Sequence, residues 1–351
     1  MQTRRQLGVH FMALSALMTT RSFPAFAADE TLRFGSISVD GSPTYVSGLV
    51  PYARAMEQAA GGKLEVALKP AGGYGKPTEL IAMVEHGDIE MAATVQGYYP
   101  GRFPATTVIE LPLLFENGIA GTKALTALFK EGLVAKDYGG LKVLALYAVA
   151  PFGIFTTGKK INSLRDLRGM RIRVPGTTVG LAMARLGAIP LGIPVSTMGD
   201  AIANGIVDAI AFSMDSTLGT KGAGGKYIYE QMSVAVDLRF ASPAQCVVMN
   251  QAKWDALPAD MRTAIETASA NFLIDNGRQR EDAEEAARKK FQADPRYTFV
   301  PPSQQLHDEL QLAMAPVYDD WKADMKKRGI DGDRLLARTR ELVKQFSVAS
   351  N

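Results

Sequence analysis

The alternation of apolar and polar positions predicts strands separated by helices in the first third of the chain. Residues 31–39, 64–68 and 89–95 have the pattern of strands. A helical pattern covers residues 45–61, where it ends at a pair of glycines, and a second helix is expected over residues 77–86. This β-α-β-α-β order predicts a largely parallel sheet.

A similar unit is expected later in the chain. Residues 142–147 and 152–156 are typical of strands, and residues 202–212 repeat the pattern of residues 83–93. In both copies a helix ends at a glycine, and an acidic residue lies at the start of an apolar strand of small residues. Two lobes built alike would explain the repeat, although this junction is common in α/β proteins. The expected fold class is therefore α/β.

The longest helical pattern covers residues 259–293, between two prolines. A typical helix has about 11–12 residues, and Gly277 near the middle of this one permits a bend. Such a helix either runs across both lobes and braces them, or forms a coiled-coil or dimer contact. Two further helices are expected at about 303–327 and 334–346.

The first 27 residues have the organisation of a secretory signal peptide. Arg4 and Arg5 precede a short apolar run, and residues 25–27 form an A-x-A cleavage site. The paired arginines also resemble a twin-arginine signal, although ordinary signals carry such pairs too. We predict export and cleavage after Ala27, so mass spectrometry of the exported protein should find Ala28 at its N-terminus. A folded exported product that keeps the leader would contradict this prediction.

The leader also accounts for the basic character of the chain. The net charge is +3, and the leader contains three arginines and no acidic residue, so the remaining chain is formally neutral. Neutrality gives no indication of a nucleic-acid partner. The single cysteine, Cys246, lies in an apolar run and has no partner for an internal disulfide. The length suggests about two domains, whose stability rests on apolar cores.

The sequence contains no recognisable catalytic or metal-binding motif. Of its three histidines, His10 lies in the leader, and His86 and His307 are isolated. The zinc, nucleophile-elbow and thiol-redox patterns are missing, and the nearest approach to a phosphate loop, at Gly75-Lys76, has prolines at two required positions. We therefore expect no enzyme, no cofactor and no metal, although paired carboxylates of a hydrolase cannot be recognised from sequence.

The most informative stretch is residues 167–178. Apolar residues and arginines alternate over residues 170–174, as in a strand that stops at Pro175, and a helix start follows Gly176. Ligands of open α/β sheets bind at the carboxyl ends of strands, where a guanidinium holds two oxygens of a carboxylate or phosphate. The amides of the helix start favour the same anion. Arg173 is thus a candidate anion clamp; the alternative is a surface strand with solvated arginines.

Several segments together resemble the DctP family, the periplasmic solute-binding proteins of tripartite ATP-independent periplasmic (TRAP) transporters. The most specific are residues 161–175, 186–190 and 205–208, and residues 61–66 and 254–258 also match family landmarks. The resemblance implies a two-lobed periplasmic-binding-protein fold with mainly parallel sheets and a ligand cleft between lobes that close by a hinge motion. It also implies a periplasmic location, a small organic-acid ligand and TRAP membrane permease subunits as partners.

The resemblance further implies a division into lobes and a set of ligand-binding residues. Lobe I is expected to comprise residues 28–152 and about 240–277, and lobe II about 153–239 and about 278–351, after the signal peptide of residues 1–27. In the family, the arginine equivalent to Arg173 holds the ligand carboxylate. The other candidate ligand-binding residues are Phe212, Thr177, Met214, Asp215, Phe152, Tyr74, Tyr98 and Tyr99.

Two positions depart from the family pattern. Many members have an asparagine where Phe212 stands, and an arginine in the segment that here contains Phe152 and no arginine. Loss of two polar anchors favours a monocarboxylate with an apolar or aromatic body, or a 2-oxo acid, over a dicarboxylate; alternatively, both rings are ordinary core residues. A binding subunit of another transporter or a sensor, a secreted enzyme on the same fold, and an interaction protein with an empty cleft remain as alternative functions.

Overall fold

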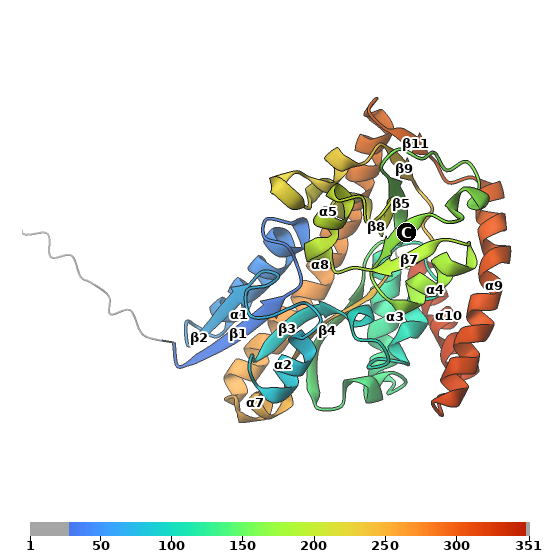
Figure 1. The fold of residues 1–351 in the computed structure, drawn as a ribbon. Coiled ribbons are helices and arrows are strands. Elements are labelled where there is room, and N and C mark those ends of the chain that lie inside the picture. The colour runs from blue at the N-terminus through green and yellow to red at the C-terminus, as the bar shows by residue number, and fades with distance from the viewer. Residues whose placement is uncertain (1–27, 349–351) are drawn as a thin grey trace, which may run out of the picture.

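The computed structural model describes residues 28–348, and the predicted cleavage site after Ala27 lies at the edge of this range. Two β-sheets flanked by helices form two lobes (Figure 1). The strands of the first sheet are β1 (Glu30–Ser36), β2 (Leu64–Lys69), β3 (Met91–Val95), β4 (Leu141–Ala148) and β10 (Ala244–Asn250). Those of the second are β5 (Gly153–Thr156), β6 (Arg171–Val174), β7 (Ile189–Gly192), β8 (Ala209–Phe212), β9 (Val234–Val236) and β11 (Thr298–Val300).

The strand orders are β2-β1-β3-β10-β4 and β11-β9-β5-β8-β6-β7. In the first sheet β1 pairs in parallel with β2 and β3, and in the second β6 pairs in parallel with β7 and β8. The strands β10 and β5 run antiparallel to their neighbours. The predicted α/β class is confirmed, and both sheets are mixed because these antiparallel strands lie beside the parallel βαβ units.

Helices cover the sheets and connect the lobes (Figure 1). They are α1 (Val50–Ala59), α2 (Leu80–His86), α3 (Gly118–Lys130), α4 (Thr177–Arg185), α5 (Val195–Ala203), α6 (Met214–Gly219), α7 (Gln251–Ala256), α8 (Ala259–Ala293), α9 (Gln304–Lys327) and α10 (Gly332–Val348). A π-helical turn at Thr44–Leu49 precedes α1. Short 3₁₀ turns lie at Gln96–Tyr98, Thr106–Glu110, Ala135–Tyr138, Leu164–Leu167, Ala223–Gly225 and Ile228–Gln231.

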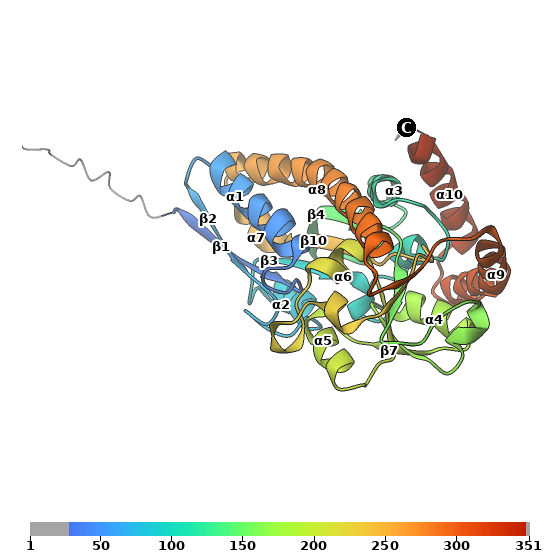
Figure 2. The same cartoon turned by 90° about the horizontal axis from the view of Figure 1, so that it is seen from above.

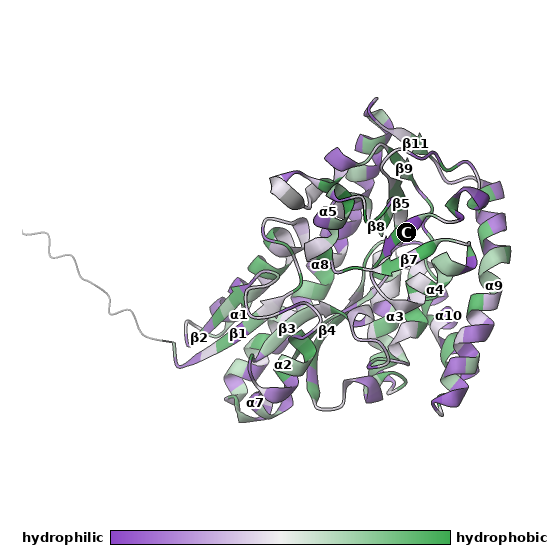
Figure 3. Cartoon of the chain, viewed as in Figure 1, coloured by the Kyte–Doolittle hydropathy of each residue, from purple (hydrophilic) through white to green (hydrophobic). Residues whose placement is uncertain are grey.

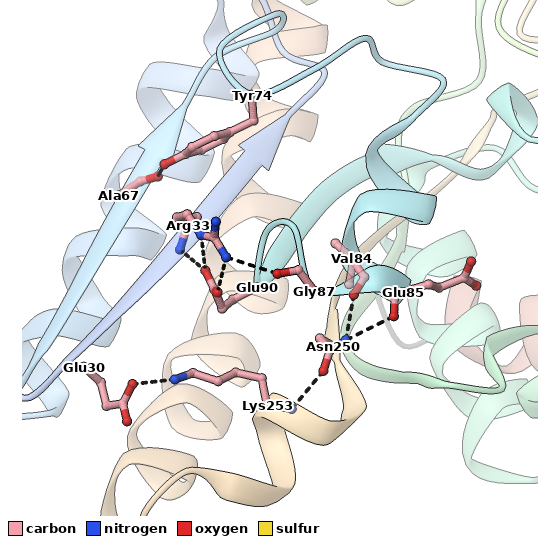
Figure 4. Close-up of polar contacts among 10 residues, drawn as sticks. All are labelled: Glu30, Arg33, Ala67, Tyr74, Val84, Glu85, Gly87, Glu90, Asn250 and Lys253. Atoms are coloured by element: carbon pink, nitrogen blue, oxygen red, sulfur yellow. Dashed lines mark hydrogen bonds and ion pairs between the residues drawn. The ribbon is translucent and has the colours of Figure 1, made fainter.

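The repeat seen in the sequence has the same geometry in both sheets. Glu90 precedes β3 and accepts hydrogen bonds from the backbone N and the Nε of Arg33 on β1, at 2.7 and 3.0 Å (Figure 4). Asp208 precedes β8 and accepts from the backbone N and Nε of Arg171 on β6, at 2.9 and 3.1 Å. Each lobe therefore contains a βαβ unit whose parallel strands are joined by an arginine–carboxylate pair.

The long helix α8 runs across both lobes, as Figure 2 shows. Its first half packs on α1, where Phe272 stacks on Tyr52 with ring centroids 4.7 Å apart. Its second half packs on α6 and on the second sheet, where Phe291 contacts Phe155 of β5 with centroids 5.2 Å apart. Burying one helix in both lobes joins them, so the expectation of a bracing helix is confirmed.

The last two helices connect the lobes on another side. The helix α9 packs against α4, and the Nε1 of its Trp321 donates to the Oγ1 of Thr107, at 2.8 Å, in the first lobe. The helix α10 packs against α3, with its apolar face buried there. The proposed lobe boundaries remain a prediction; α10, which they assign to the second lobe, packs against α3 of the first lobe.

Apolar residues concentrate in the strands and on the inner helix faces, whereas the outer faces of α8 and α9 are mainly hydrophilic (Figure 3). The buried apolar residues form one large cluster that continues through both lobes and a smaller one under α1 and α8. Among residues 28–348, none of the helices combines the length and the apolarity needed to span a bilayer.

Candidate functional site

Arg173 lies near the end of β6 with only 1% of its surface exposed. Its Nε donates to the carbonyl of Ile193 at 2.8 Å, its Nη1 to the carbonyl of Ala211 at 3.3 Å, and its Nη2 to the hydroxyl of Tyr98 at 3.3 Å. None of the ion pairs formed within the described residues includes it. Burial lowers the pKa of Arg173, but arginine stays protonated in proteins, so a buried positive charge faces the site without a counter-ion.

Arg171, two residues earlier on the same strand, has a different environment. Its guanidinium pairs with the carboxylate of Asp208 at 2.6 Å, and both side chains are partly exposed. This pairing raises the pKa of Arg171 and lowers the pKa of Asp208. The two arginines of the motif therefore differ: Arg171 holds two strands of the sheet together, and Arg173 has no acidic partner among the described residues.

Arg173 lines a cavity of about 60 Å³ between the two lobes. One part of its wall is apolar and includes Val95, Val149 and the rings of Phe152 and Phe212. The two rings meet edge to face, with centroids 5.8 Å apart, and the guanidinium carbon of Arg173 lies 5.5 Å from the centre of the Phe212 ring. The structure thus brings three of the sequence-predicted residues together, with the Phe212 ring beside the buried charge and the Phe152 ring against Phe212.

Tyr98 belongs to the first lobe, but its side chain bonds to the second. It follows β3, and its hydroxyl accepts hydrogen bonds from the backbone N of Val195 at 2.9 Å and from Arg173. A phenol oxygen accepts two hydrogen bonds and donates one. Both accepted bonds come from the second lobe, and they do not use the hydroxyl proton of Tyr98, which lines the cavity.

The backbones of the two lobes also touch beside this cavity. A Cβ atom added to Gly176 would lie 2.6 Å from the Cα of Gly97, and one added to Gly97 would lie 2.9 Å from the Cα of Gly176. Gly97 follows β3 and Gly176 follows β6. Together with the hydrogen bonds of Tyr98, this contact shows that the lobes are closed on each other.

Met214 and Asp215 lie at the start of α6, directly after the cavity residue Ser213. Both are buried, and their backbone amides donate to the carboxylate of Glu284 on α8, at 3.1 and 3.0 Å. Burial, followed by the nearby Asp215 carboxylate, raises the pKa of Glu284. The side chain of Asp215 pairs with Arg280 of α8 at 2.7 Å, so Asp215 supports the cavity wall from behind.

Besides Met214 and Asp215, three more of the sequence-predicted residues lie outside the lining of the cavity that contains Arg173. The Tyr74 hydroxyl donates to the carbonyl of Ala67 on β2 at 2.8 Å (Figure 4). The Tyr99 hydroxyl donates to the carbonyl of Pro77 at 2.7 Å, and Thr177 opens α4 on the far side of Gly176. Aromatic and helix-start residues of these types are common near clefts, but here neighbouring backbone already engages both tyrosine hydroxyls.

Tyr99 and Thr177 instead line a separate cavity of about 400 Å³ between α4, α9 and the first lobe. Its arginines are neutralised, because Arg185 pairs with Asp320 and Arg328 pairs with Asp324. The larger cavity therefore presents no free cation to a ligand. The smaller cavity is the candidate site, since it contains a buried charge that lacks a partner.

Sequence reasoning missed a polar wall of the cavity, formed by Ser42, Thr44, Ser216 and Arg280. The guanidinium of Arg280 donates to the hydroxyls of Thr44 and Ser216, at 3.1 and 2.9 Å, besides its pair with Asp215. Arg280 stands in the charge-dense half of α8, where nothing in the sequence distinguishes it from solvated neighbours. Among residues 28–348, no three histidine, cysteine, aspartate or glutamate side chains are placed so that they could hold a metal ion.

Comparison with known proteins identifies the family. The model of the bacterial extracellular solute-binding proteins, family 7 (DctP), matches residues 34–324. A TRAP solute-binding protein from Rhodoferax ferrireducens, solved with copurified benzoate, is 25% identical with a TM-score of 0.85 and covers 92% of this chain and 100% of its own.

A marine-metagenome TRAP protein described as specific for aromatic acid ligands is 27% identical with a TM-score of 0.83, over 90% of this chain and 99% of its own. The C4-dicarboxylate-binding periplasmic protein DctP of Rhodobacter capsulatus is 26% identical over 82% of this chain and 84% of its own length. The chain belongs to the DctP family, the bacterial extracellular solute-binding proteins of family 7 that serve TRAP transporters.

Proposed function

We propose that this chain is a periplasmic receptor that captures a small organic monocarboxylate on Arg173 and delivers it to the membrane permease subunits of a TRAP transporter. The observation that carries the proposal is the buried Arg173 guanidinium, which has no acidic partner among the described residues. Taking such a charge out of water is costly unless it is paired. A ligand carboxylate supplies the missing negative charge and accepts two parallel hydrogen bonds from the guanidinium.

The charges around the cavity support one carboxylate rather than two. Arg280 also lines the cavity, but it is paired with Asp215, so the two contribute no net charge. Arg173 therefore leaves one positive charge uncompensated. A second carboxylate would lose its hydration without gaining a cation, and a buried unpaired charge is strongly disfavoured.

The aromatic walls support a ligand with an apolar or aromatic body. Phe152 and Phe212 both line the cavity and meet edge to face, and aromatic groups prefer offset and edge-to-face partners. The relatives described as specific for aromatic acids and as containing benzoate are consistent with this chemistry. The dicarboxylate-binding relative shows that ligands differ within the family. The preference for one carboxylate therefore rests on the single uncompensated positive charge of this cavity.

Closure of the lobes completes the proposed mechanism. The carboxylate binds Arg173 of the second lobe while the lobes are open. When the lobes close, Tyr98 of the first lobe approaches, and its hydroxyl donates a hydrogen bond to a carboxylate oxygen. The bonds that Tyr98 accepts from Val195 and Arg173 hold this closed state. The ligand thus stabilises the closed form by contacting both lobes, as a population shift requires.

The family consists of transport proteins, and we propose that this chain likewise leaves its ligand chemically unchanged. A secreted enzyme on the same fold is the second candidate. Nuclear magnetic resonance of the acid recovered after prolonged incubation separates the two, because an enzyme would convert it. A receptor for a sensor or another transporter would bind the same acids, but would not restore uptake together with TRAP permease subunits.

The choice of ligand is tested by titration calorimetry with matched acids. We expect aromatic or branched monocarboxylates, or 2-oxo acids, to bind in the micromolar range or tighter. Succinate and malate should bind at least about tenfold more weakly, because their second carboxylate is desolvated without a partner. Submicromolar binding of succinate or malate, with no response to any of the monocarboxylates, would contradict the proposal.

A further inference from the structure

Ser42 carries an unused hydrogen-bonding group at the ligand cavity. Only 4% of the residue is exposed, and its Oγ is fully buried without a hydrogen-bond partner. Ser42 nevertheless belongs to the cavity wall. Buried hydroxyls are nearly always hydrogen-bonded in folded proteins, so an orphaned one beside a binding cavity indicates a group that is satisfied when the cavity is filled.

The usual structural role of such a serine does not apply here. A serine before a helix commonly caps it, by accepting a hydrogen bond from a backbone amide of the first turn. Ser42 precedes the helical turn at residues 44–49, but the amides of Tyr45 and Val46 donate to its backbone carbonyl, at 3.0 and 2.9 Å. No side-chain cap is formed at this turn, so the Ser42 hydroxyl is left for another partner.

The surroundings of Ser42 fix its position but do not use its hydroxyl. Pro43 packs directly on Gly219 of α6, and Thr44 accepts a hydrogen bond from Arg280 at 3.1 Å. The Nη atoms of Arg280 are engaged by Thr44, Asp215 and Ser216. The polar groups around Ser42 therefore bond to one another and not to its hydroxyl. This part of the wall is polar but carries no net charge.

This neutral polar wall is separate from the anion site. Arg173 bonds to Ile193, Ala211 and Tyr98, and no hydrogen bond within the described residues joins it to Ser42 or to the group around Arg280. The apolar surfaces of Phe152 and Phe212 line the same cavity. A ligand that fills it therefore meets a cation, apolar rings and a neutral hydrogen-bonding wall.

We propose that Ser42 forms a second ligand subsite, which recognises an uncharged hydroxyl group on the body of the bound monocarboxylate. This inference rests on the proposed function, because Arg173 must first hold the carboxylate. A serine hydroxyl donates and accepts, which matches a ligand hydroxyl in either direction. A charged substituent is disfavoured, because Arg280, the cation of this polar wall, is already neutralised by Asp215.

The test compares matched acids on the parent protein and on Ser42→Ala by titration calorimetry. The probes are phenylacetate, its 3-hydroxy and 4-hydroxy derivatives, and 3-methylphenylacetate as a control for size. We expect the parent to prefer one hydroxylated acid over phenylacetate and the methyl derivative by about tenfold, the usual order for one hydrogen bond. In Ser42→Ala that preference should fall to about twofold or less, while phenylacetate binds as before.

The matched control is Ser347→Ala, which removes the same atom from a serine outside the cavity lining, whose hydroxyl donates to the carbonyl of Val343 within α10 at 2.8 Å, and it should keep the preference. Loss of the preference in Ser347→Ala as well, or equal weakening of every acid in Ser42→Ala, would overturn the assignment to Ser42. A parent that binds the hydroxylated and unsubstituted acids equally would overturn the subsite and leave the proposed function standing. If no monocarboxylate or 2-oxo acid binds the parent at all, the proposed function itself fails.

Discussion

Replacing Arg173 by alanine is expected to abolish high-affinity ligand binding and to leave the unliganded protein at least as stable as the parent. Truncating one partner of a buried charge pair typically costs about 2–5 kcal/mol of binding free energy, so affinity should fall by at least about 30-fold. Arg173→Lys should also bind poorly, because an ammonium lacks the planar fork that holds two carboxylate oxygens.

The stability of the unliganded variant separates a binding role from a structural one. Arg173 is buried without a counter-ion, and removing an unpaired buried charge relieves a desolvation cost. The melting temperature without ligand should therefore stay level or rise, and the increase that ligand gives the parent should disappear. A lower melting temperature together with unchanged affinity would identify Arg173 as a structural residue.

Arg171 provides the matched control. It stands on the same strand, but it is partly exposed and paired with Asp208, and it lies outside the cavity lining. Exposed ion pairs contribute about 0–1 kcal/mol, so Arg171→Ala should lose little stability and bind ligand within about twofold of the parent. Calorimetry on the two variants side by side tests whether the position of the charge, rather than its presence on β6, governs binding.

The contrast between these arginines shows what the sequence was able to predict. The β-α-β pattern, the strand that ends at Pro175 and the bounds of α8 follow from local periodicity and from prolines, and the structure has them. The repeated acidic residues were visible too, although their role in binding Arg33 and Arg171 was not. Local patterns placed Arg173 on a strand that stops before Pro175, because a strand and its end are local features; its role as an anion clamp stays a prediction.

The rest of the site depends on contacts between distant parts of the chain. Arg280 bonds to Thr44 across 236 residues, and to Ser216 across 64. The sequence pattern of the charged half of α8 does not distinguish Arg280, whose side chain lines the cavity, from the other charged residues of that helix. The same limit explains Tyr74, which has the residue type and neighbourhood expected of a cleft but bonds to the adjacent strand. The type of a residue indicated its surroundings only where local secondary structure already fixed its place in the fold.

Replacing Gly176 by alanine is expected to weaken ligand binding by holding the lobes apart. The new Cβ would lie 2.6 Å from the Cα of Gly97, a distance at which backbone must move. Gly176 has extended φ and ψ angles of −179°, which alanine also adopts, so the effect arises from the contact between lobes rather than from backbone strain. Overpacking typically costs about 1–3 kcal/mol, which corresponds to about a 5- to 150-fold loss of affinity.

Small-angle X-ray scattering and calorimetry together test this effect. With saturating ligand, the parent should become more compact, whereas Gly176→Ala should keep a larger radius of gyration and bind more weakly. Gly158→Ala is the control, because a Cβ there has no heavy atom within 4 Å. Since the contact exists only between closed lobes, the melting temperature of unliganded Gly176→Ala should match the parent. If the variant closes and binds like the parent, the glycine contact is not what limits closure, and the bonds of Tyr98 to Val195 and Arg173 are sufficient to hold the lobes together.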